Sequence, residues 1–398
     1  MLSQTSLVFP LPNNSISSHI IDDELIVFDA RSRQLVRLNE TATQIWKIHE
    51  NNVSPEDIAS ELSVIYGLKK EELLPDIVTA LNEWYAMGML GDEHLPTIEE
   101  EADVLGHLKK SVVNYEDKQD LISVKEFTFL DAGFVVMVSS DELKDIVLPL
   151  FSHLEKADNK TTHKIKVIEE KSSYIILDND MELGRTNKLE EVAPIVNAHV
   201  LVAGFLEVDC LSVFHSGVVY DNDGVVLLSA GSGSGKSTLT AALMCSGKNF
   251  FTDELAILTC DKKIRPAPGC IGLKKGSWDV IEEFYPDIFE LATHERQDDK
   301  VVKYVPPTSS PPSIQQQKQG EEVRAIVFPN YSPECQSTLT EISAADALVK
   351  ITDAGYHTNQ TLNHESVAQL VEWIIDIPAY ELKVNNLKEA VNLVSGLF

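Results

Sequence analysis

The sequence predicts an α/β (α+β) P-loop domain, preceded by a small winged-helix-like domain made of a β-hairpin and three helices. Three observations lead to this fold class. A glycine-rich turn separates an apolar run from a helix-forming run within residues 227–243. A second apolar run ends in two adjacent acids, Asp253 and Glu254. Residues 25–90 show the period of strands first and that of helices afterwards.

The glycine-rich turn reads "SAGSGSGKSTL" and begins at Ser229. Backbone N–H groups of such a turn, placed at a helix N-terminus, wrap a phosphate chain. The lysine reaches the terminal phosphates and the following hydroxyl ligates Mg²⁺. An alanine replaces the usual first glycine and leaves this cradle intact. The sequence therefore predicts binding of a nucleoside triphosphate, with ATP and Mg²⁺ as cofactors. The predicted nucleotide-binding residues are Ala230, Gly231, Ser232, Gly233, Ser234, Gly235, Lys236, Ser237 and Thr238.

Composition limits the classes of partner. The chain of 398 residues carries 33 Lys and Arg against 62 Asp and Glu, which gives a net charge of −29. This length accommodates about two or three domains. The negative charge argues against nucleic-acid binding through a broad basic face and against docking on an anionic membrane. We expect a small ligand, or a neutral or basic partner.

Cysteine usage and the apolar segments indicate a cytoplasmic protein. The five cysteines form no CxxC pair, and no histidine stands at zinc-like spacing from them, as expected for reduced thiols. The first residues lack the basic start and apolar core of a signal peptide. Polar residues interrupt the most apolar stretch, 192–211, which therefore predicts a buried helix and no membrane span.

Capping and turn residues mark the ends of the N-terminal elements clearly. Residues 25–38 alternate around a polar turn, which predicts two short strands. Asn39 is placed to cap a first helix, and Ser54 a second helix that Gly67 ends. A third helix ends near Gly88. A hairpin with three short helices is the winged-helix plan.

Charge argues against the DNA binding that is common for this plan. Between residues 39 and 90, nine acids stand against three lysines, and that balance repels phosphates. The segments "LVRLNETATQIWKI", "SPEDIASELSVIYG" and "EWYAMGML" instead resemble a PqqD-like domain, over about residues 18–92. The alternative is a small helical domain without a ligand.

The PqqD-like resemblance implies a module that recognises the leader of a ribosomally made, later modified peptide. The precursor would add as a strand to the hairpin edge and pack on the third helix. Carried onto this chain, the resemblance implies a peptide-binding surface made of Leu35, Val36, Arg37, Leu38, Asp76, Ala80 and Trp84.

Changes in composition predict the domain boundaries. The PqqD-like domain is expected over residues 1–94, an acidic linker over 95–118, and the P-loop domain over 119–398. Within the last, 119–200 is rich in strand patterns and 201–398 holds the nucleotide-binding core.

The two adjacent acids distinguish between classes of P-loop protein. Asp253 and Glu254 follow Lys236 by the length of one helix, and two carboxylates beside a phosphate cradle suit Mg²⁺ coordination and acceptance of a proton from a hydroxyl. Capping of a surface turn is the other interpretation. The signature motif of ABC-type ATPases is absent from the sequence, and so is the N-K-x-D of small GTPases.

The C-terminal part resembles the kinase domain of HPr kinase/phosphorylase, and more closely the HPr-kinase-related kinases. The resemblance rests on "FHSGVVYDNDGVVLLSAGSGSGKSTLTAAL", "FFTDELAIL", "RPAPGCIGLKKGSW" and "DIPAYELKVNNLKEAVNLVSGL". It implies a fold shared with phosphoenolpyruvate carboxykinase, phosphorylation of a hydroxyl by ATP, and a homo-oligomer.

The same resemblance implies roles for individual residues. Lys236 would neutralise phosphate charge, Ser237 would hold Mg²⁺, and His215 would lie near the phosphates. Asp253 would act as general base and Glu254 as Mg²⁺ ligand or second base, with the division between the two open. The family has two aspartates there, so the glutamate weakens any expectation of phosphorylase activity.

Several basic residues keep two interpretations. Lys274 and Lys275 either reach phosphate or substrate, or stand on an exposed turn; Lys300 and Lys303 either help bind nucleotide or are solvated. The Pro/Ser/Gln-rich stretch 306–322 predicts a mobile loop, because it offers little apolar area to bury.

Together these observations predict a cytoplasmic Mg²⁺/ATP-dependent kinase that phosphorylates a serine, or a threonine, of a peptide held by the N-terminal domain. Two alternatives stay open. One is a kinase for a free small metabolite such as serine. The other is a non-catalytic, nucleotide-gated peptide chaperone.

Overall fold

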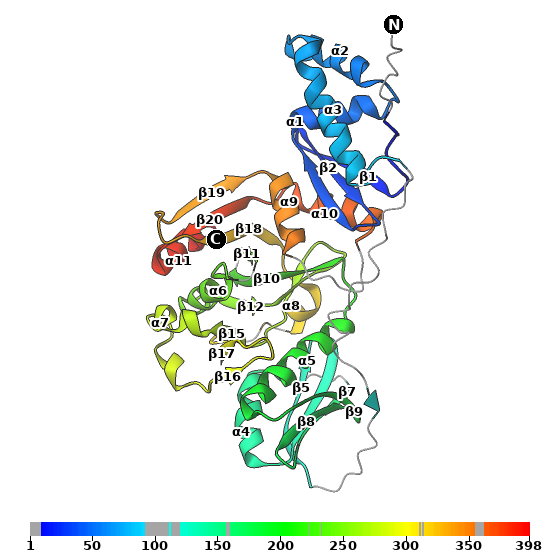
Figure 1. Cartoon of the computed structure of the whole chain (residues 1–398). Helices are drawn as coiled ribbons and strands as arrows, with labels where there is room; N and C mark the ends of the chain where they lie inside the picture. Colours follow the sequence, from blue (N-terminus) through cyan, green and yellow to red (C-terminus); the bar gives the residue numbers. More distant parts are fainter. Residues whose placement is uncertain are drawn as a thin grey trace. The chain divides into compact units, whose positions relative to one another are not determined.

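The computed structural model describes residues 9–91, 111–112, 120–156, 160–221, 223–231, 233–309, 312, 314–354 and 362–398. The chain forms two compact units (Figure 1). The first comprises residues up to Glu101 together with Ser343–Val349 and Thr361–Asp376, and the second comprises the rest. Two segments of the expected C-terminal domain thus join the first unit. Nearly all of the expected linker, 95–118, lies outside the described residues.

The first unit contains a three-stranded antiparallel sheet. Its order is β1 (Ile16–Ile21), β2 (Glu24–Asp29) and β3 (Gln34–Leu38). The expected hairpin corresponds to β2 and β3. The prediction of a hairpin alone was wrong, because β1 adds a third strand whose sequence, "ISSHII", alternates too weakly to be recognised.

Three helices pack on one face of this sheet. They are α1 (Glu40–His49), α2 (Pro55–Tyr66) and α3 (Lys70–Ala86). The predicted caps are confirmed: Asn39 accepts from the amide of Ala42, Ser54 accepts from that of Asp57, and Gly67 ends α2 with φ of 67°. The shared core includes the following buried side chains from β2 and all three helices: Leu25, Val27, Trp46, Leu62, Leu81 and Trp84.

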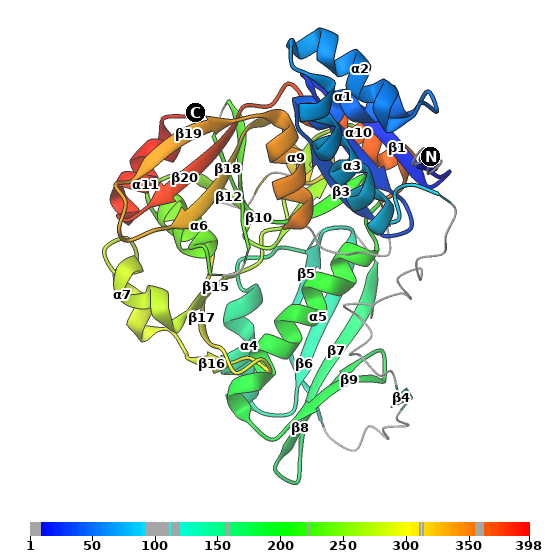
Figure 2. The same ribbon diagram turned by 45° about the horizontal axis from the view of Figure 1, so that its top comes forward.

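The opposite face of the sheet is buried by segments from far along the chain. Ile26 and Phe28 alternate with the residues that face α1 to α3, and both are fully buried. Helix α10 (His364–Ile374) packs against β1 (Figure 2). The His364 ring meets the Phe28 ring edge-on, with the ring centroids 5.8 Å apart. From the first turn of α9 (Ala344–Asp353), Asp346 pairs with Arg37 on β3 at 2.5 Å. The sheet is therefore sandwiched between two helical layers.

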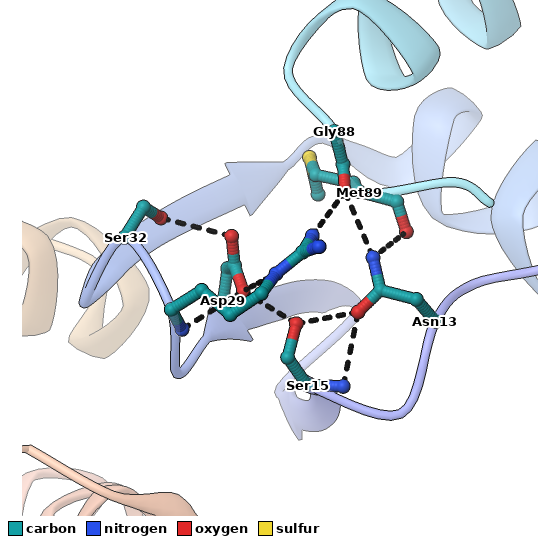
Figure 3. A network of polar contacts seen from close by, with 7 residues as sticks. Asn13, Ser15, Asp29, Ser32, Gly88 and Met89 are labelled. Atoms are coloured by element: carbon teal, nitrogen blue, oxygen red, sulfur yellow. Dashed lines mark hydrogen bonds and ion pairs between the residues drawn. The ribbon is translucent and has the colours of Figure 1, made fainter. Parts of the chain in front are cut away.

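A polar network ties the start of this unit to its end (Figure 3). The Asp29 carboxylate accepts hydrogen bonds from Ser15 Oγ at 2.6 Å and from Ser32 Oγ at 3.0 Å. Asn13 Nδ2 donates to the carbonyl of Gly88 at 2.8 Å. Burial alone would raise the pKa of Asp29, but these hydrogen bonds and those from Arg31 outweigh it and hold the pKa below its usual value.

The second unit is built on an eight-stranded mixed sheet of order β14-β13-β10-β11-β18-β20-β19, with β12 also paired to β10. Helices α6 (Lys236–Cys245) and α11 (Leu387–Ser395) pack against it over one apolar core. Its strands are β10 (Ser212–Asp221), β11 (Gly224–Ser229), β12 (Asn249–Thr252), β13 (Leu255–Leu258), β14 (Ile264–Arg265), β18 (Val323–Tyr331), β19 (Thr338–Ile342) and β20 (Ala379–Val384).

A second, six-stranded sheet has the order β4-β9-β8-β7-β6-β5. Its strands β5 to β9 lie within 119–200, the part predicted to be rich in strands, whereas β4 lies within the expected linker. It shares one core with α4 (Asp141–Phe151) and α5 (Val192–Leu206). Its strands are β4 (Ser111–Val112), β5 (Ile122–Phe129), β6 (Ala132–Val138), β7 (Thr161–Glu170), β8 (Ser173–Asp178) and β9 (Met181–Thr186).

Helix α5 with the short turn η1 (Leu189–Glu191) makes one segment long and apolar enough, by length and composition, to cross a membrane. In this structure 56% of that segment, Leu189–Leu206, is buried, and α5 contacts β5, β8, β9 and α4. This degree of burial is expected of a helix in the core of a folded unit.

A small three-stranded sheet and several short helices complete the unit. The sheet order is β15 (Ile271–Lys274), β17 (Val301–Val305) and β16 (His294–Glu295). The short helices are η2 (Lys275–Ser277), α7 (Trp278–Ile281), η3 (Pro286–Glu290) and α8 (Ile314–Gln319). Helix α8 lies inside stretch 306–322, so the prediction of a loop throughout that stretch was wrong.

The two-sided burial of the small sheet predicts that α10 stabilises the N-terminal unit. Leu370 is fully buried on α10, so Leu370→Ala is expected to lower the free energy of unfolding of this unit by about 2–5 kcal/mol. Hydrogen exchange of the β2 amides measures this loss. Glu365→Gln, at an exposed position of the same helix, is the control. Unchanged β2 protection in Leu370→Ala would contradict the sandwich arrangement.

Candidate functional site

The glycine-rich turn joins the buried strand β11 to α6, in the strand, turn and helix order that the sequence predicts. Gly233 and Gly235 have φ values of 92° and 90°, which side chains with a Cβ rarely adopt. Gly235 is also the N-cap of α6, so the turn delivers its backbone to the start of the helix. Of the predicted nucleotide-binding residues, Ser232 lies outside the described residues.

Lys236, the first residue of α6, is only 6% exposed. Its Nζ donates to the backbone oxygen of Asp253 at 2.5 Å and lies 3.9 Å from Asp253 Oδ1. The fold therefore brings the lysine of the turn to the first of the two predicted acids.

Strand β10 places both acids. It pairs antiparallel with β12, where Val218 lies opposite Thr252, and with β13, where His215 lies opposite Leu255. The two residues between β12 and β13 interrupt this pairing, and the register with β10 is the same at the pair before them and at the pair after them. Asp253 and Glu254 therefore lie opposite Gly217 and Ser216. The Thr252 hydroxyl accepts from the amides of Glu254 and Leu255, at 3.2 and 3.1 Å, and stabilises this break in the strand.

Asp253 is a buried carboxylate, 3% exposed. Neither carboxylate oxygen has a hydrogen-bond partner in the part of the chain that the structure describes. Burial raises the pKa of Asp253, while Lys236 and the Ser237 hydroxyl favour its charged form and oppose that rise. Two buried oxygens without a hydrogen-bond partner, beside a hydroxyl and a second carboxylate, suit a hard cation such as Mg²⁺. The residues present thus fit the expected metal.

Glu254 lies at the more open side of the site. Its Oε2 is 3.0 Å from His215 Nε2, and both side chains are 31% exposed. The structure therefore brings together four residues named from the sequence: His215, Lys236, Asp253 and Glu254.

Gly217 is a site residue that sequence reasoning missed. A Cβ placed on it would lie 2.1 Å from Thr240 Oγ1 and 3.3 Å from Asp253 Oδ1. Because β10 runs directly under α6 and the acids, only a glycine leaves room for them. The signal available was the glycine in "FHSGVVY", which has no turn residues around it.

The basic residues beside the site differ in environment. Burial lowers the pKa of Lys274, and the neighbouring cations Lys300 and Arg296 lower it further. Lys300 forms an exposed ion pair with Asp298 at 2.7 Å. Lys303 is only 4% exposed and donates to the carbonyl of Leu291, so the expectation that Lys303 is solvated was wrong.

The peptide-binding residues expected in the first unit divide into two groups. Leu38 and Trp84 are each 4% exposed and belong to the core, where the Trp84 ring meets that of Trp46. The remaining five reach the surface at least in part: Leu35, Val36, Arg37, Asp76 and Ala80. The Arg37 guanidinium already pairs with Glu24, at 2.7 Å, and with Asp346.

Comparisons with known proteins bear on the first unit. Residues 24–90 match the family model of coenzyme PQQ synthesis protein D (PqqD). No curated protein matches the chain. A solved structure, "TbiB1 in Complex with the TbiA(beta) Leader Peptide", is similar to part of it, with 19% identity, a TM-score of 0.20, and coverage of 21% of this chain and 99% of that one. By the family match alone, the chain contains a PqqD domain, which spans β2 to α3.

The close approach at Gly217 makes a prediction. Gly217→Ala is expected to lower the free energy of unfolding by about 1–3 kcal/mol, because the new methyl group meets Thr240 Oγ1 at 2.1 Å. Thermal unfolding measures the change. Gly276→Ala is the matched control, because the added Cβ meets no atom within 4 Å other than those of its chain neighbours. Thr240→Ala should partly restore stability to Gly217→Ala. Equal stability of the two glycine variants would rule out the crowding.

Proposed function

We propose that this protein is an Mg²⁺/ATP-dependent kinase. It would phosphorylate a serine, or less readily a threonine, of a ribosomally made peptide whose leader the PqqD domain binds. One observation carries the kinase part of this proposal. Lys236 of the glycine-rich turn and the buried Asp253 lie 3.9 Å apart, which matches a phosphate-binding cation beside a proton acceptor.

The turn and Lys236 would bind the ATP phosphates. Backbone N–H groups from Gly233 to Ser237 suit anionic oxygens, and the Lys236 ammonium would neutralise the charge that grows during transfer. When bound by Ser237, Asp253 and Glu254, Mg²⁺ supplies further neutralisation of phosphate charge.

Asp253 is the proposed general base. In the reaction the acceptor oxygen forms a bond to the γ-phosphorus, the bond from that phosphorus to the ADP oxygen breaks, and the hydroxyl proton passes to the Asp253 carboxylate. Burial raises the pKa of this carboxylate and so makes it a better proton acceptor than an exposed aspartate. His215, 3.0 Å from Glu254, would orient the second carboxylate.

The PqqD domain supports peptide recognition. In the described part of the chain β3 is an edge strand of its sheet, and such an edge accepts a further strand through its backbone. Val36 and Ala80 lie partly buried against the domain core and offer apolar contacts beside that edge. A leader held there would raise the concentration of the acceptor hydroxyl at the kinase site, to about millimolar for a short flexible connection.

The kinase proposal predicts the effect of one substitution. Asp253→Asn should lower phosphate transfer at least about 100-fold, because it removes the proton acceptor. It should not change ATP binding, because the backbone oxygen of residue 253 still accepts from Lys236 and holds that side chain in place. Mass spectrometry of the short peptides encoded beside the gene, incubated with protein, Mg²⁺ and ATP, measures transfer. Asp261→Asn, at an exposed acid, is the control.

The outcomes separate the alternatives. A gain of one phosphate on a serine or threonine, absent in Asp253→Asn, supports the proposal. ATP and peptide binding without any transfer would favour the chaperone. Turnover of free serine, with no gain from any peptide, would favour the metabolite kinase.

Peptide recognition is tested separately at the edge strand. Val36→Glu should weaken binding of a fluorescently labelled precursor peptide about 10-fold or more, since a charge replaces an apolar contact on β3. Fluorescence anisotropy measures the affinity. Val64→Glu provides the matched control, because Val64 is 85% exposed on α2 of the same unit. Equal affinity of both variants would argue against binding at β3.

A further inference from the structure

Three side chains from separate elements of the second unit converge on one point. His163 lies on β7, Asp178 ends β8 and His199 lies on α5. One potential ligand atom from each lies within 4.8 Å of the other two. The side chains are 18%, 7% and 9% exposed, so the cluster is largely shielded from water. None of the three has a part in the proposed kinase reaction.

One carboxylate oxygen is the centre of this cluster. Asp178 Oδ2 lies 2.6 Å from His163 Nδ1 and 3.0 Å from His199 Nε2. The other oxygen, Oδ1, accepts from the backbone amide of Lys164 at 3.1 Å, which holds the carboxylate in place. Two imidazole rings therefore direct a ring nitrogen at the same oxygen.

These distances are close to those of a metal site. Zn²⁺ binds imidazole nitrogen and carboxylate oxygen at about 2.0–2.2 Å, so tetrahedral ligand atoms lie about 3.4 Å apart. Each imidazole would have to move from Asp178 by less than about 1 Å to admit an ion. The ion would replace the hydrogen-bonding protons between Asp178 and the two imidazole rings.

The surroundings of His163 match the second shell of a metal ligand. Metal-bound histidines commonly donate their other ring N–H to a carboxylate. His163 Nε2 lies 3.2 Å from Glu207 Oε1, while Nδ1 faces the cluster. The ring also stacks on Phe134, with centroids 4.9 Å apart and planes 16° apart, which fixes its orientation.

His199 directs its polar contact at the cluster as well. Its Nδ1 is buried and has no hydrogen-bond partner in the described structure, whereas Nε2 faces Asp178. The ring is set by its place on α5, whose core residues pack against the six-stranded sheet. Both imidazoles are thus held with one nitrogen toward the same point.

We propose that His163, Asp178 and His199 bind one divalent first-row transition-metal ion of the Zn²⁺ class, with water as the fourth ligand. Two imidazoles favour such an ion over Mg²⁺ or Ca²⁺, which prefer oxygen ligands. The ion would fasten α5 to β7 and β8. Helix α5 is followed along the chain by β10, the strand that carries Gly217. The ion would therefore stabilise the helix that immediately precedes this strand.

Metal content of the full chain is the first test. The protein is stripped with a chelator, dialysed against micromolar Zn²⁺, then against metal-free buffer, and analysed by elemental mass spectrometry. One Zn²⁺ per chain, with a rise of several degrees in the melting temperature, is expected. Co²⁺ in place of Zn²⁺ should give the visible absorption of a four-coordinate site. A wild-type chain that retains no ion overturns the proposal.

Variants locate the ion. Asp178→Asn and His199→Gln should each lower Zn²⁺ affinity at least 10-fold, and Glu207→Gln about 10-fold through its contact with His163. His19→Ala, in the other unit, should retain the ion. His215→Gln tests the kinase site, which also holds a histidine and two acids. Loss of Zn²⁺ in His215→Gln with retention in Asp178→Asn and His199→Gln would overturn the assignment.

Discussion

The candidate site depends on the pairing of one strand, β10, with three neighbours. On one side it pairs with β11, which leads into the glycine-rich turn. On the other side it pairs with β12 and β13, and the pairs Val218–Thr252 and His215–Leu255 share one register. The pairing is interrupted at the two residues between β12 and β13. These are Asp253 and Glu254, and the shared strand sets their distance from Lys236. The arrangement requires a glycine at position 217, because a side chain there would collide with Thr240.

The small unit obeys a different constraint. A three-stranded sheet has two faces, and apolar residues on both must be covered. Its own helices cover Leu25 and Val27, whereas Phe28 on the other face meets His364 of α10, in the connection between β19 and β20. These two strands are neighbours in the large sheet, so a short turn would suffice to join them. The connection is long because it contributes helices to another core.

Local signals could be read from the sequence, and distant contacts could not. Caps at Asn39 and Ser54, the αL glycine at Gly67 and the strand, turn and helix around Lys236 depend on neighbouring residues alone. Strand β1, the burial of Lys303 and the packing of α10 on β1 depend on partners elsewhere in the chain. The same holds for His163, Asp178 and His199, whose spacing follows no metal-binding pattern. The PqqD-like resemblance assigns Trp84 to the peptide-binding surface, whereas its ring packs against Trp46 in the core.

Burial of both faces of the small sheet also determines when this unit can complete its folding during synthesis. Arg37 and its partner Asp346 are 309 residues apart, and chains emerge from the ribosome with the N-terminus first. The N-terminal unit therefore leaves the ribosome with one apolar sheet face still uncovered, and it must wait for nearly the whole chain before that face is closed. Until then β2 presents Ile26 and Phe28 to solvent and to other nascent chains. Completion of the earliest part of this protein is, in this sense, one of the last events of its folding.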